Sequence, residues 1–316
     1  MITLDACLSD ISSAAIAGHI RPDGDSVGSC LAVYNYILAV DPRICVDVYL
    51  EPIPEKFSFL KNADRIREPK EADPANIYDV FFCLDCGDAE RLGAAYPVFQ
   101  SAKRTVCIDH HATNQSFADV NEVEPQASST AEMIFRRMDK ERINEAIAAC
   151  LYLGIAHDTG VFRYSNTSPE TMNIAGFLMG KGIPYSKILD ETYYIRSFVQ
   201  QRIWGKALRD AELFLDGKCI VSVITKEDQE TFGASPEELD GIVSELRSTE
   251  GVEVAVFLYE LDDGYKISLR STSYVDVAQI ARELGGGGHA RAAGAEGGSD
   301  PEEIREQLLA RIAAQI

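Results

Sequence analysis

Three apolar runs of strand length in the first half of the chain each lead directly into aspartate or histidine residues. The runs cover about 14–20, 78–84 and 104–108, and helix-length patterns alternate with them. This alternation favours an α/β fold with a mainly parallel sheet. In open sheets of that kind, ligands bind beyond the carboxyl ends of the strands. We therefore expect the polar residues that follow the three runs to converge at one edge of the sheet.

The second half of the chain has a different pattern, which predicts a smaller mixed-sheet α/β domain. A helix is expected from Ser168 and Pro169, as cap and first residue, to Met179. A long helical stretch over about 185–214, which holds the single tryptophan, is the expected connection between domains. Later strands are expected near 219–224, 252–259 and 265–270, and later helices near 236–248, 275–283 and 301–312. The predicted organisation is a first domain over 1–187, a helical linker over 188–214 and a second domain over 215–316.

Composition limits the classes of partner. A chain of 316 residues can form two domains with ordinary cores. Its net charge of -20 argues against binding along duplex nucleic acid, which depends on phosphate neutralisation by Lys and Arg. No basic segment precedes an apolar stretch at the N-terminus, and no apolar run approaches membrane-spanning length. We expect a cytoplasmic protein with reduced cysteines and no membrane or long-duplex partner, with a homodimer left open.

The five histidines all lie within a few residues of an aspartate or inside a glycine-rich run. In the segment His19 to Asp25, Gly24 separates two aspartates, so that Asp23 and Asp25 can point toward one cavity. Two carboxylates so close together repel each other unless cations lie between them. The alternative is an aspartate-rich loop that caps the next helix, which is expected over about 26–39. A helix over about 144–156 would deliver His157 and Asp158 to the same edge.

Adding the later strand-end residues favours a metal site over a helix cap. Asp85, His110 and Asp158 bring the carboxylates to four, whose charge two divalent ions would balance. Carboxylates and imidazoles suit Mn²⁺ and related ions better than a thiolate set, which would favour zinc. Such a centre would bind a small anionic phosphate.

Two motifs now resemble a known family. Asp109-His110-His111, with the aspartates and histidines named above, resembles the DHH phosphoesterase superfamily. The later Gly285 to Gly288 run, continued by His289, Arg291 and Gly294, is similar to the DHHA1 substrate-binding module. The resemblance covers essentially the whole chain, with both motifs in the family's order.

This resemblance implies a role for each residue of the first domain. His19 and Asp23 would hold one metal ion, and Asp25, His110 and Asp158 the other. Asp85 would bridge the two ions, which can share a hydroxide and aim it at phosphorus. His111 would contact the scissile phosphate, and Asp109 would orient a neighbouring imidazole. The catalytic set is therefore expected to be Asp85, Asp109 and His111.

For the second domain, the resemblance implies a phosphate-binding loop rather than a floppy hinge. Its backbone N–H groups and a guanidinium would surround a phosphate. The expected substrate-binding residues, besides His111, are Arg270, Gly287, Gly288, His289 and Arg291. A solvated charge at a strand end is the alternative for Arg270.

For several other residues we expect a structural role, or simple exposure to solvent, in place of a role in the site. A buried histidine at a helix end accounts for His157, and structural or solvated roles account for Arg163 and Arg196. Ser128-Ser129-Thr130 is expected to cap the following helix, although the family places such a segment near its site. One isolated pair, Cys83 and Cys86, is expected to pack in the core rather than to bind zinc.

The resemblance implies a two-metal phosphoesterase acting on short oligoribonucleotides and on 3'-phosphoadenosine-5'-phosphate (pAp). The products would be nucleoside 5'-monophosphates and AMP. Two alternatives stay open at this point: a cyclic or linear di-AMP phosphodiesterase, and a non-catalytic nucleotide-sensing protein of the same fold.

Overall fold

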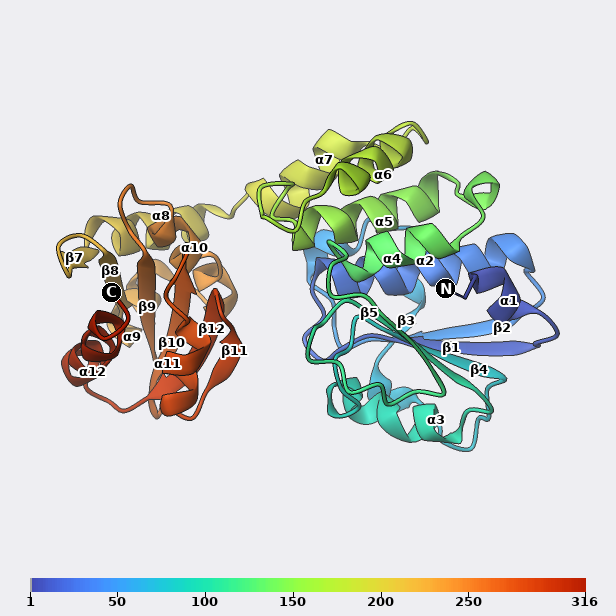
Figure 1. The fold of residues 1–316 in the computed structure, drawn as a ribbon, viewed down its shortest axis with the longest axis horizontal. Helices are drawn as coiled ribbons and strands as arrows, with labels where there is room; N and C mark the ends of the chain where they lie inside the picture. The colour runs from blue at the N-terminus through green and yellow to red at the C-terminus, as the bar shows by residue number, and fades with distance from the viewer. Residues whose placement is uncertain (1) are drawn as a thin grey trace. The chain divides into compact units, whose positions relative to one another are not determined.

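The computed structural model describes residues 2–316, except for the side chain of His289. The chain forms an N-terminal unit that ends at Ile195 and a C-terminal unit over Arg196–Ile316 (Figure 1). A six-stranded sheet lies at the centre of each unit. The predicted α/β fold with two domains is confirmed.

The sheet of the N-terminal unit has the strand order β3-β2-β1-β4-β5-β6, and every described neighbouring pair is parallel. Its strands are β1 (Ser13–Ala17), β2 (Cys45–Tyr49), β3 (Ile66–Arg67), β4 (Val80–Leu84), β5 (Thr105–Asp109) and β6 (Val120–Val123). The order reverses at β1, which pairs with β2 on one side and β4 on the other. In such sheets the carboxyl ends of the strands at the reversal form the ligand-binding edge.

Both faces of this sheet are buried under helices. The N-terminal helices are α1 (Leu4–Leu8), α2 (Gly24–Val40), α3 (Tyr96–Ser101), α4 (Thr130–Arg137), α5 (Glu145–Asp158), α6 (Pro169–Met179) and α7 (Tyr185–Leu189). Figure 1 shows α2, α4 and α5 together on one side of the sheet and α3 on the other. Alternate residues of β1 follow this division, since Ile16 packs in one core and Ala15 in the other. Strands that are buried on both faces explain the continuous apolar runs of the sequence.

The strands end where the candidate residues begin. The segment from Gly18 to Asp25 follows β1, Asp85 follows β4, and Asp109 is the last residue of β5. His157 and Asp158 lie in the last turn of α5, so this helix extends two residues beyond its expected end. The expected convergence at one edge of the sheet is confirmed for these segments.

The prediction of one long helix over about 185–214 is wrong. Instead, α7 is followed by a π-helix (η6, Asp190–Tyr194), an extended segment, α8 (Phe198–Arg209) and β7 (Glu212–Phe214). Ser197 starts α8 as an N-cap, because its side chain accepts a hydrogen bond from the backbone N–H of Gln200. After α8, residues with positive φ at Leu215, Asp216 and Gly217 form the turn of a hairpin.

The sheet of the C-terminal unit has the order β11-β12-β10-β9-β8-β7 and is mixed, with β8 and β9 parallel and the other pairs antiparallel. Its further strands are β8 (Cys219–Ile224), β9 (Val254–Leu261), β10 (Gly264–Ser271), β11 (Gly287–His289) and β12 (Ala292–Gly297). Its further helices are α9 (Lys226–Phe232), α10 (Ile242–Arg247), α11 (Val277–Glu283) and α12 (Pro301–Ala313). The single helix expected near 236–248 is divided at Gly241, whose φ is 90°.

The glycine run differs from the expectation of an irregular loop. Gly287 to His289 form β11, an edge strand that pairs antiparallel with β12. A Cβ at Gly288, where φ is 141°, would lie 2.5 Å from the carbonyl oxygen of Ala292. Only glycine fits this close pairing of two backbones.

In the described part of the chain, no helix is both long and apolar enough to cross a membrane.

Candidate metal centre

The first group of ligand atoms comes from the loop after β1 and from the end of β4. His19, Asp23 and Asp85 each offer one atom, and the three atoms lie within 4.8 Å of one another. His19 Nε2 is 3.5 Å from Asp85 Oδ2 and 3.8 Å from Asp23 Oδ1. The other ring nitrogen, Nδ1, donates a hydrogen bond to the carbonyl of Ile20 at 2.7 Å. This bond fixes the ring and leaves Nε2 directed at the carboxylates.

Asp23 has a second role, because it is also the N-cap of α2. Its Oδ1 accepts hydrogen bonds from the backbone N–H groups of Asp25 and Ser26, at 3.0 and 3.1 Å. The helix-cap explanation that the sequence left open is therefore correct for Asp23. It does not exclude the metal explanation, because both hydrogen bonds go to Oδ1 and a carboxylate has a second oxygen with lone pairs of its own.

The second group lies on the other side of Asp85. It consists of Asp25, His110 and Asp158, whose ligand atoms are also within 4.8 Å of one another, and those of Asp85, His110 and His111 meet the same limit. His110 Nε2 is 3.0 Å from Asp158 Oδ2 and 3.6 Å from Asp85 Oδ1. Asp85 thus turns one carboxylate oxygen toward His19 and the other toward His110. This placement between two groups is the geometry that a bridging carboxylate needs.

The backbone of Asp85 is strained, since its φ is 56°, a left-handed conformation that is uncommon for residues other than glycine. Aspartate tolerates this region better than most residues. Its amide still donates to the carbonyl of Ile108, at 3.1 Å. Strain at a residue between two candidate ligand groups is typical of a functional position.

Helix α4 holds the buried Asp25 in place, and the sequence did not indicate this. The N–H of Thr130 donates to Asp25 Oδ2 at 2.7 Å, and the N–H of Ala131 donates to Oδ1 at 3.0 Å. The hydroxyl of Thr130 donates to Asp85 Oδ1 at 3.1 Å. Ser129 caps α4, as the sequence predicts, by accepting from the N–H of Glu132. The segment therefore both caps a helix and contacts the centre.

Asp109 orients His111. The Nδ1–H of His111 donates to Asp109 Oδ1 at 2.7 Å, and Asp109 is fully buried. The side-chain amide of Asn114, which sequence reasoning missed, donates to the other carboxylate oxygen at 2.7 Å. Asp109 thereby holds the His111 ring in one orientation, with its Nδ1 3.7 Å from Asp85 Oδ1.

The electrostatics favour positive charge at this centre. Burial raises the pKa of Asp25 well above its ordinary value, and repulsion from Asp85 and Asp158 raises it further. Burial likewise raises the pKa of Asp158 to about 6, with the nearby Asp85 adding to the effect and His110 opposing it. Burial lowers the pKa of His110, but the hydrogen bond and charge of Asp158 outweigh it and raise the pKa to about 10. Divalent cations bound by these carboxylate and imidazole donors would offset the repulsion between the carboxylates. The donor set therefore fits divalent cations.

Several residues with bland explanations lie outside these groups. His157 packs edge-on against Phe57 and hydrogen-bonds Thr192 at 3.0 Å, and burial lowers its pKa to about 4. The guanidinium of Arg196 lies over the ring of Trp204, 3.9 Å from its centre. Arg163 is exposed. Cys83 and Cys86 are fully buried in the core beneath the sheet, so the packing interpretation is confirmed.

The predicted substrate residues of the C-terminal unit lie around Ala292 of β12. Arg270 is its register partner in β10 and His289 its partner in β11, while Arg291 precedes it in the chain. The role predicted for the His289 side chain concerns atoms outside the described part of the structure. Arg291 donates to the carbonyl of Val275 at 2.7 Å, and Arg270 to the carbonyl of Leu269 at 3.0 Å. The fold thus groups these residues, together with Gly287 and Gly288 of β11.

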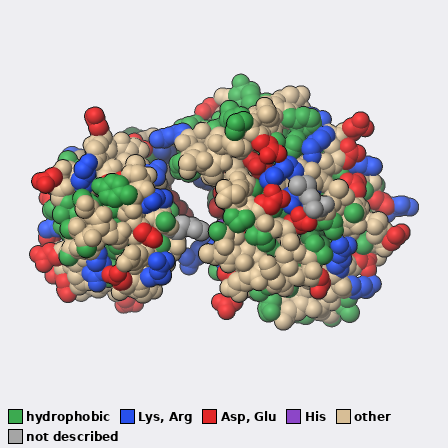
Figure 2. All heavy atoms as spheres, viewed as in Figure 1, with side chains coloured by type: hydrophobic (Ala, Val, Ile, Leu, Met, Phe, Trp, Pro, Cys, Tyr) green, Lys and Arg blue, Asp and Glu red, His purple; other side chains and the backbone are tan. Residues whose placement is uncertain are grey.

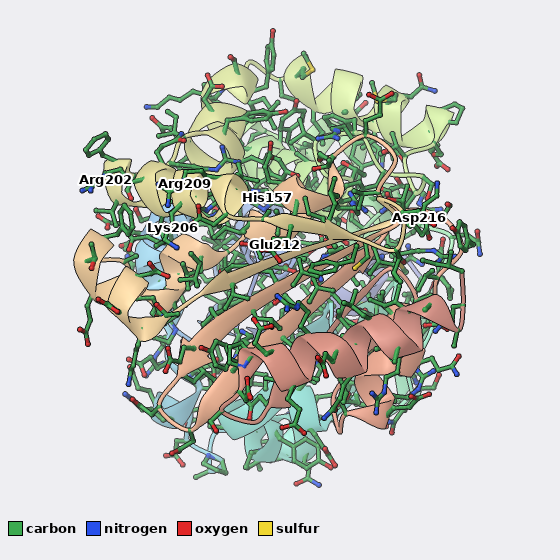
Figure 3. All side chains as sticks on the ribbon, turned by 90° about the vertical axis from the view of Figure 1, so that its left-hand side faces the viewer. His157, Arg202, Lys206, Arg209, Glu212 and Asp216 are labelled. Carbon is green, nitrogen blue, oxygen red and sulfur yellow. The ribbon has the colours of Figure 1, made fainter. Side chains whose placement is uncertain are left out.

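Basic side chains do not form a continuous surface on the face shown in Figure 2, where they are interspersed with acidic ones. Figure 3 shows Arg202, Lys206 and Arg209 following one another along α8. Lys206 pairs with Asp210 at 2.8 Å and with Asp228 at 3.2 Å, and Arg209 also pairs with Asp210. Carboxylates therefore balance much of the positive charge on this helix.

Comparisons with known proteins agree with the two-domain fold and identify the class of protein as a phosphoesterase. Residues 13–155 match the DHH family, N-terminal domain, and residues 216–316 match the DHHA1 domain. The chain belongs to the DHH family, as its motifs predict.

Individual relatives resemble the chain over most of its length. It is 32% identical to the bifunctional oligoribonuclease and PAP phosphatase NrnA of Thermus thermophilus, covering 95% of this chain and 89% of that one. The NrnA of Bacillus subtilis is 28% identical, covering 88% and 87%. A crystal structure of an exopolyphosphatase-related protein from Bacteroides fragilis has a TM-score of 0.92 at 27% identity, covering 98% of this chain and 94% of that one.

Proposed function

We propose that the protein hydrolyses short oligoribonucleotides to nucleoside 5'-monophosphates, and pAp to AMP, with two divalent cations, Mn²⁺ above all. The observation that carries this proposal is the position of Asp85, whose two carboxylate oxygens face two separate groups of ligand atoms. Relatives at 28 and 32% identity bear the name of a bifunctional oligoribonuclease and PAP phosphatase, which supports this substrate class.

The residues divide the work as follows. His19 and Asp23 would hold one cation, Asp25, His110 and Asp158 the other, and Asp85 both. When bound, the two ions would activate water for in-line attack on phosphorus and stabilise the attacking and leaving oxygens. His111, kept in orientation by Asp109, would bind the scissile phosphate. The mixture of carboxylate and imidazole donors favours Mn²⁺ over a soft thiolate-bound metal.

In the C-terminal unit, Arg270, Gly287, Gly288, His289 and Arg291 would bind a further phosphate of the substrate. A guanidinium binds phosphate through charge-assisted hydrogen bonds. The edge strand β11 adds backbone N–H groups on its open side. On this proposal the first domain, over 1–187, carries the chemistry and the last, over 215–316, binds substrate.

A product-resolved assay tests the proposal. The protein with Mn²⁺ is incubated with pAp, linear pApA, cyclic di-AMP and RNAs of two to about ten nucleotides, and the products are separated by chromatography. We expect AMP from pAp and 5'-mononucleotides from the shortest RNAs, with slower hydrolysis of longer ones. Preference for cyclic di-AMP would favour the di-AMP phosphodiesterase alternative, and binding without hydrolysis of any substrate would favour a sensor.

Two variants link the result to the centre. Asp85→Ala removes the carboxylate that faces both groups and should abolish the hydrolysis. Asp64→Ala is the matched control, because its side chain is 81% exposed and pairs only distantly with Arg65. Wild-type turnover in Asp85→Ala would show that the reaction does not depend on this centre.

A further inference from the structure

An exposed aromatic residue lies in a loop of the C-terminal unit that contacts Arg291, one of the candidate phosphate-binding residues. Tyr274 lies in the loop between β10 and α11, and 53% of its surface is exposed. A single exposed aromatic residue is common on protein surfaces and needs no explanation alone. The backbone around this one is held in an unusual way.

The loop is fixed by one buried carboxylate. Glu253, only 4% exposed, accepts hydrogen bonds from three consecutive backbone N–H groups: Ser273 at 3.1 Å, Tyr274 at 2.7 Å and Val275 at 2.9 Å. The hydroxyl of Ser273 adds a fourth, at 2.8 Å. Burial raises the pKa of Glu253, but these donors outweigh it and lower the pKa. Because the carboxylate binds the backbone, these hydrogen bonds fix the loop without any contribution from the Tyr274 ring.

The same loop contacts Arg291. The guanidinium of Arg291 donates a hydrogen bond to the carbonyl of Val275, the residue after Tyr274, at 2.7 Å. The hydroxyl of Ser271 donates to the same carbonyl at 2.7 Å. The N–H of Val277 donates to the carbonyl of Ala290 at 3.0 Å, which ties the loop to the turn that carries Arg291. Tyr274 therefore directly precedes, in the chain, the residue whose carbonyl Arg291 contacts.

We propose that Tyr274 is the residue of the C-terminal unit on which a nucleobase of the substrate stacks. The inference rests on the proposed function and adds to it what part of the substrate is recognised beyond phosphate. Aromatic rings accept every base, because each base has a π-face, and they add about 5- to 100-fold in affinity per stacked base. A ring on a pre-organised loop loses little entropy on binding. The substrate class is then short nucleotides of any sequence, in preference to phosphates without a base.

The test compares a dinucleotide with its counterpart in which one nucleoside is abasic. Steady-state KM and kcat with Mn²⁺ are measured for wild type, Tyr274→Ala and Tyr274→Phe, with the abasic position at either end. For the dinucleotide, we expect Tyr274→Ala to raise KM about 5- to 100-fold. Tyr274→Phe should stay close to wild type, because stacking does not need the hydroxyl. Tyr185→Ala, at a tyrosine of the N-terminal unit that is 43% exposed, is the control.

The decisive quantity is the coupling between the two deletions. Once the stacked base has been removed, Tyr274→Ala should have no further effect. Equal losses on both substrates, or no loss on either, would overturn the proposal, and an unchanged unfolding midpoint excludes a folding defect. If wild type hydrolyses neither substrate, the proposed function fails, and titration calorimetry of AMP against ribose 5-phosphate then tests stacking alone. Equal affinities of wild type and Tyr274→Ala for AMP would overturn the proposal that a base stacks on Tyr274.

Discussion

Helices α2 and α5 pack so closely that one added methyl group should disturb the candidate metal centre. A Cβ at Gly154 of α5 would lie 2.6 Å from Asp25 Oδ1 and 2.7 Å from the Cβ of Ala131. Asp25 has little room to move, because it is fully buried and accepts the N–H groups of Thr130 and Ala131. Because the interior is close-packed, Gly154→Ala therefore displaces Asp25 or α5 by about 1 Å.

The energetic consequence has two opposing parts. Overpacking costs about 1 to 3 kcal/mol, whereas alanine in place of glycine stabilises a helix interior by about 0.5 to 1 kcal/mol. We expect Gly154→Ala to lower the free energy of unfolding by up to about 2.5 kcal/mol and to weaken Mn²⁺ binding about 10- to 100-fold through the displaced carboxylate. Gly176→Ala in α6 is the matched control, since nothing lies within 4 Å of its Cβ, and it should be slightly stabilising.

The assay separates the two units. Urea unfolding in the presence of a chelator is followed by circular dichroism and by tryptophan fluorescence, and Mn²⁺ affinity is measured by calorimetry. Trp204, the single tryptophan, packs in the C-terminal unit, so its transition should be unaffected by Gly154→Ala. Wild-type stability and wild-type Mn²⁺ affinity in Gly154→Ala would refute the reasoning.

Three further substitutions test other contacts. Thr130→Val removes the hydroxyl that donates to Asp85 and should weaken Mn²⁺ binding about 10-fold, whereas Thr130→Ser should retain it; equal calorimetric affinities of the two variants would contradict this. Arg291→Ala should reduce kcat/KM for pAp by the equivalent of about 1.5 to 3 kcal/mol with Mn²⁺ affinity unchanged, whereas the exposed Arg282→Ala should not; lost metal affinity would point to a structural role. Glu253→Gln should destabilise the C-terminal unit at pH 7 by about 1.5 to 3 kcal/mol, measured by Trp204 fluorescence. The pKa of Glu253 is lowered by folding, so its stabilisation is present above its unfolded pKa of about 4.3 and is lost as the pH falls through the folded pKa; a wild-type-to-variant difference that stays constant down to pH 3 would disprove this.

The sequence predicts the parts of the molecule in which local pattern and final position agree. The apolar runs before Asp85 and Asp109 are strands because both faces of the sheet are buried, and their carboxyl ends share one edge. Helix α6 begins at its Ser168 cap and Pro169, as predicted. These features need only neighbouring residues to be recognised.

The features that were missed depend on distant contacts or on weak local signals. Thr130 and Asp25 are 105 residues apart, so no local pattern indicates that they hydrogen-bond. Strands β11 and β12 consist largely of glycine and alanine, which lack the β-branched side chains typical of strands. The prediction of one helix over 185–214 did not take account of two local signals. Ser197 is the cap that begins α8, and Asp216-Gly217 forms the turn of the hairpin that follows it.

The proposed hydrolysis depends on two divalent cations that share Asp85 in the N-terminal unit. The most direct measurement is Mn²⁺ binding to the chelator-treated protein, with stoichiometry from titration, magnetic coupling from electron paramagnetic resonance, and pAp hydrolysis in the same samples. We predict two ions per chain, coupled to each other because the ions of two-metal sites are about 3.5 to 4 Å apart, with hydrolysis appearing as the second ion binds. Asp85→Ala should lose the coupling and the hydrolysis together. Full hydrolysis by the metal-free protein, or a single uncoupled ion in the active protein, would contradict the account.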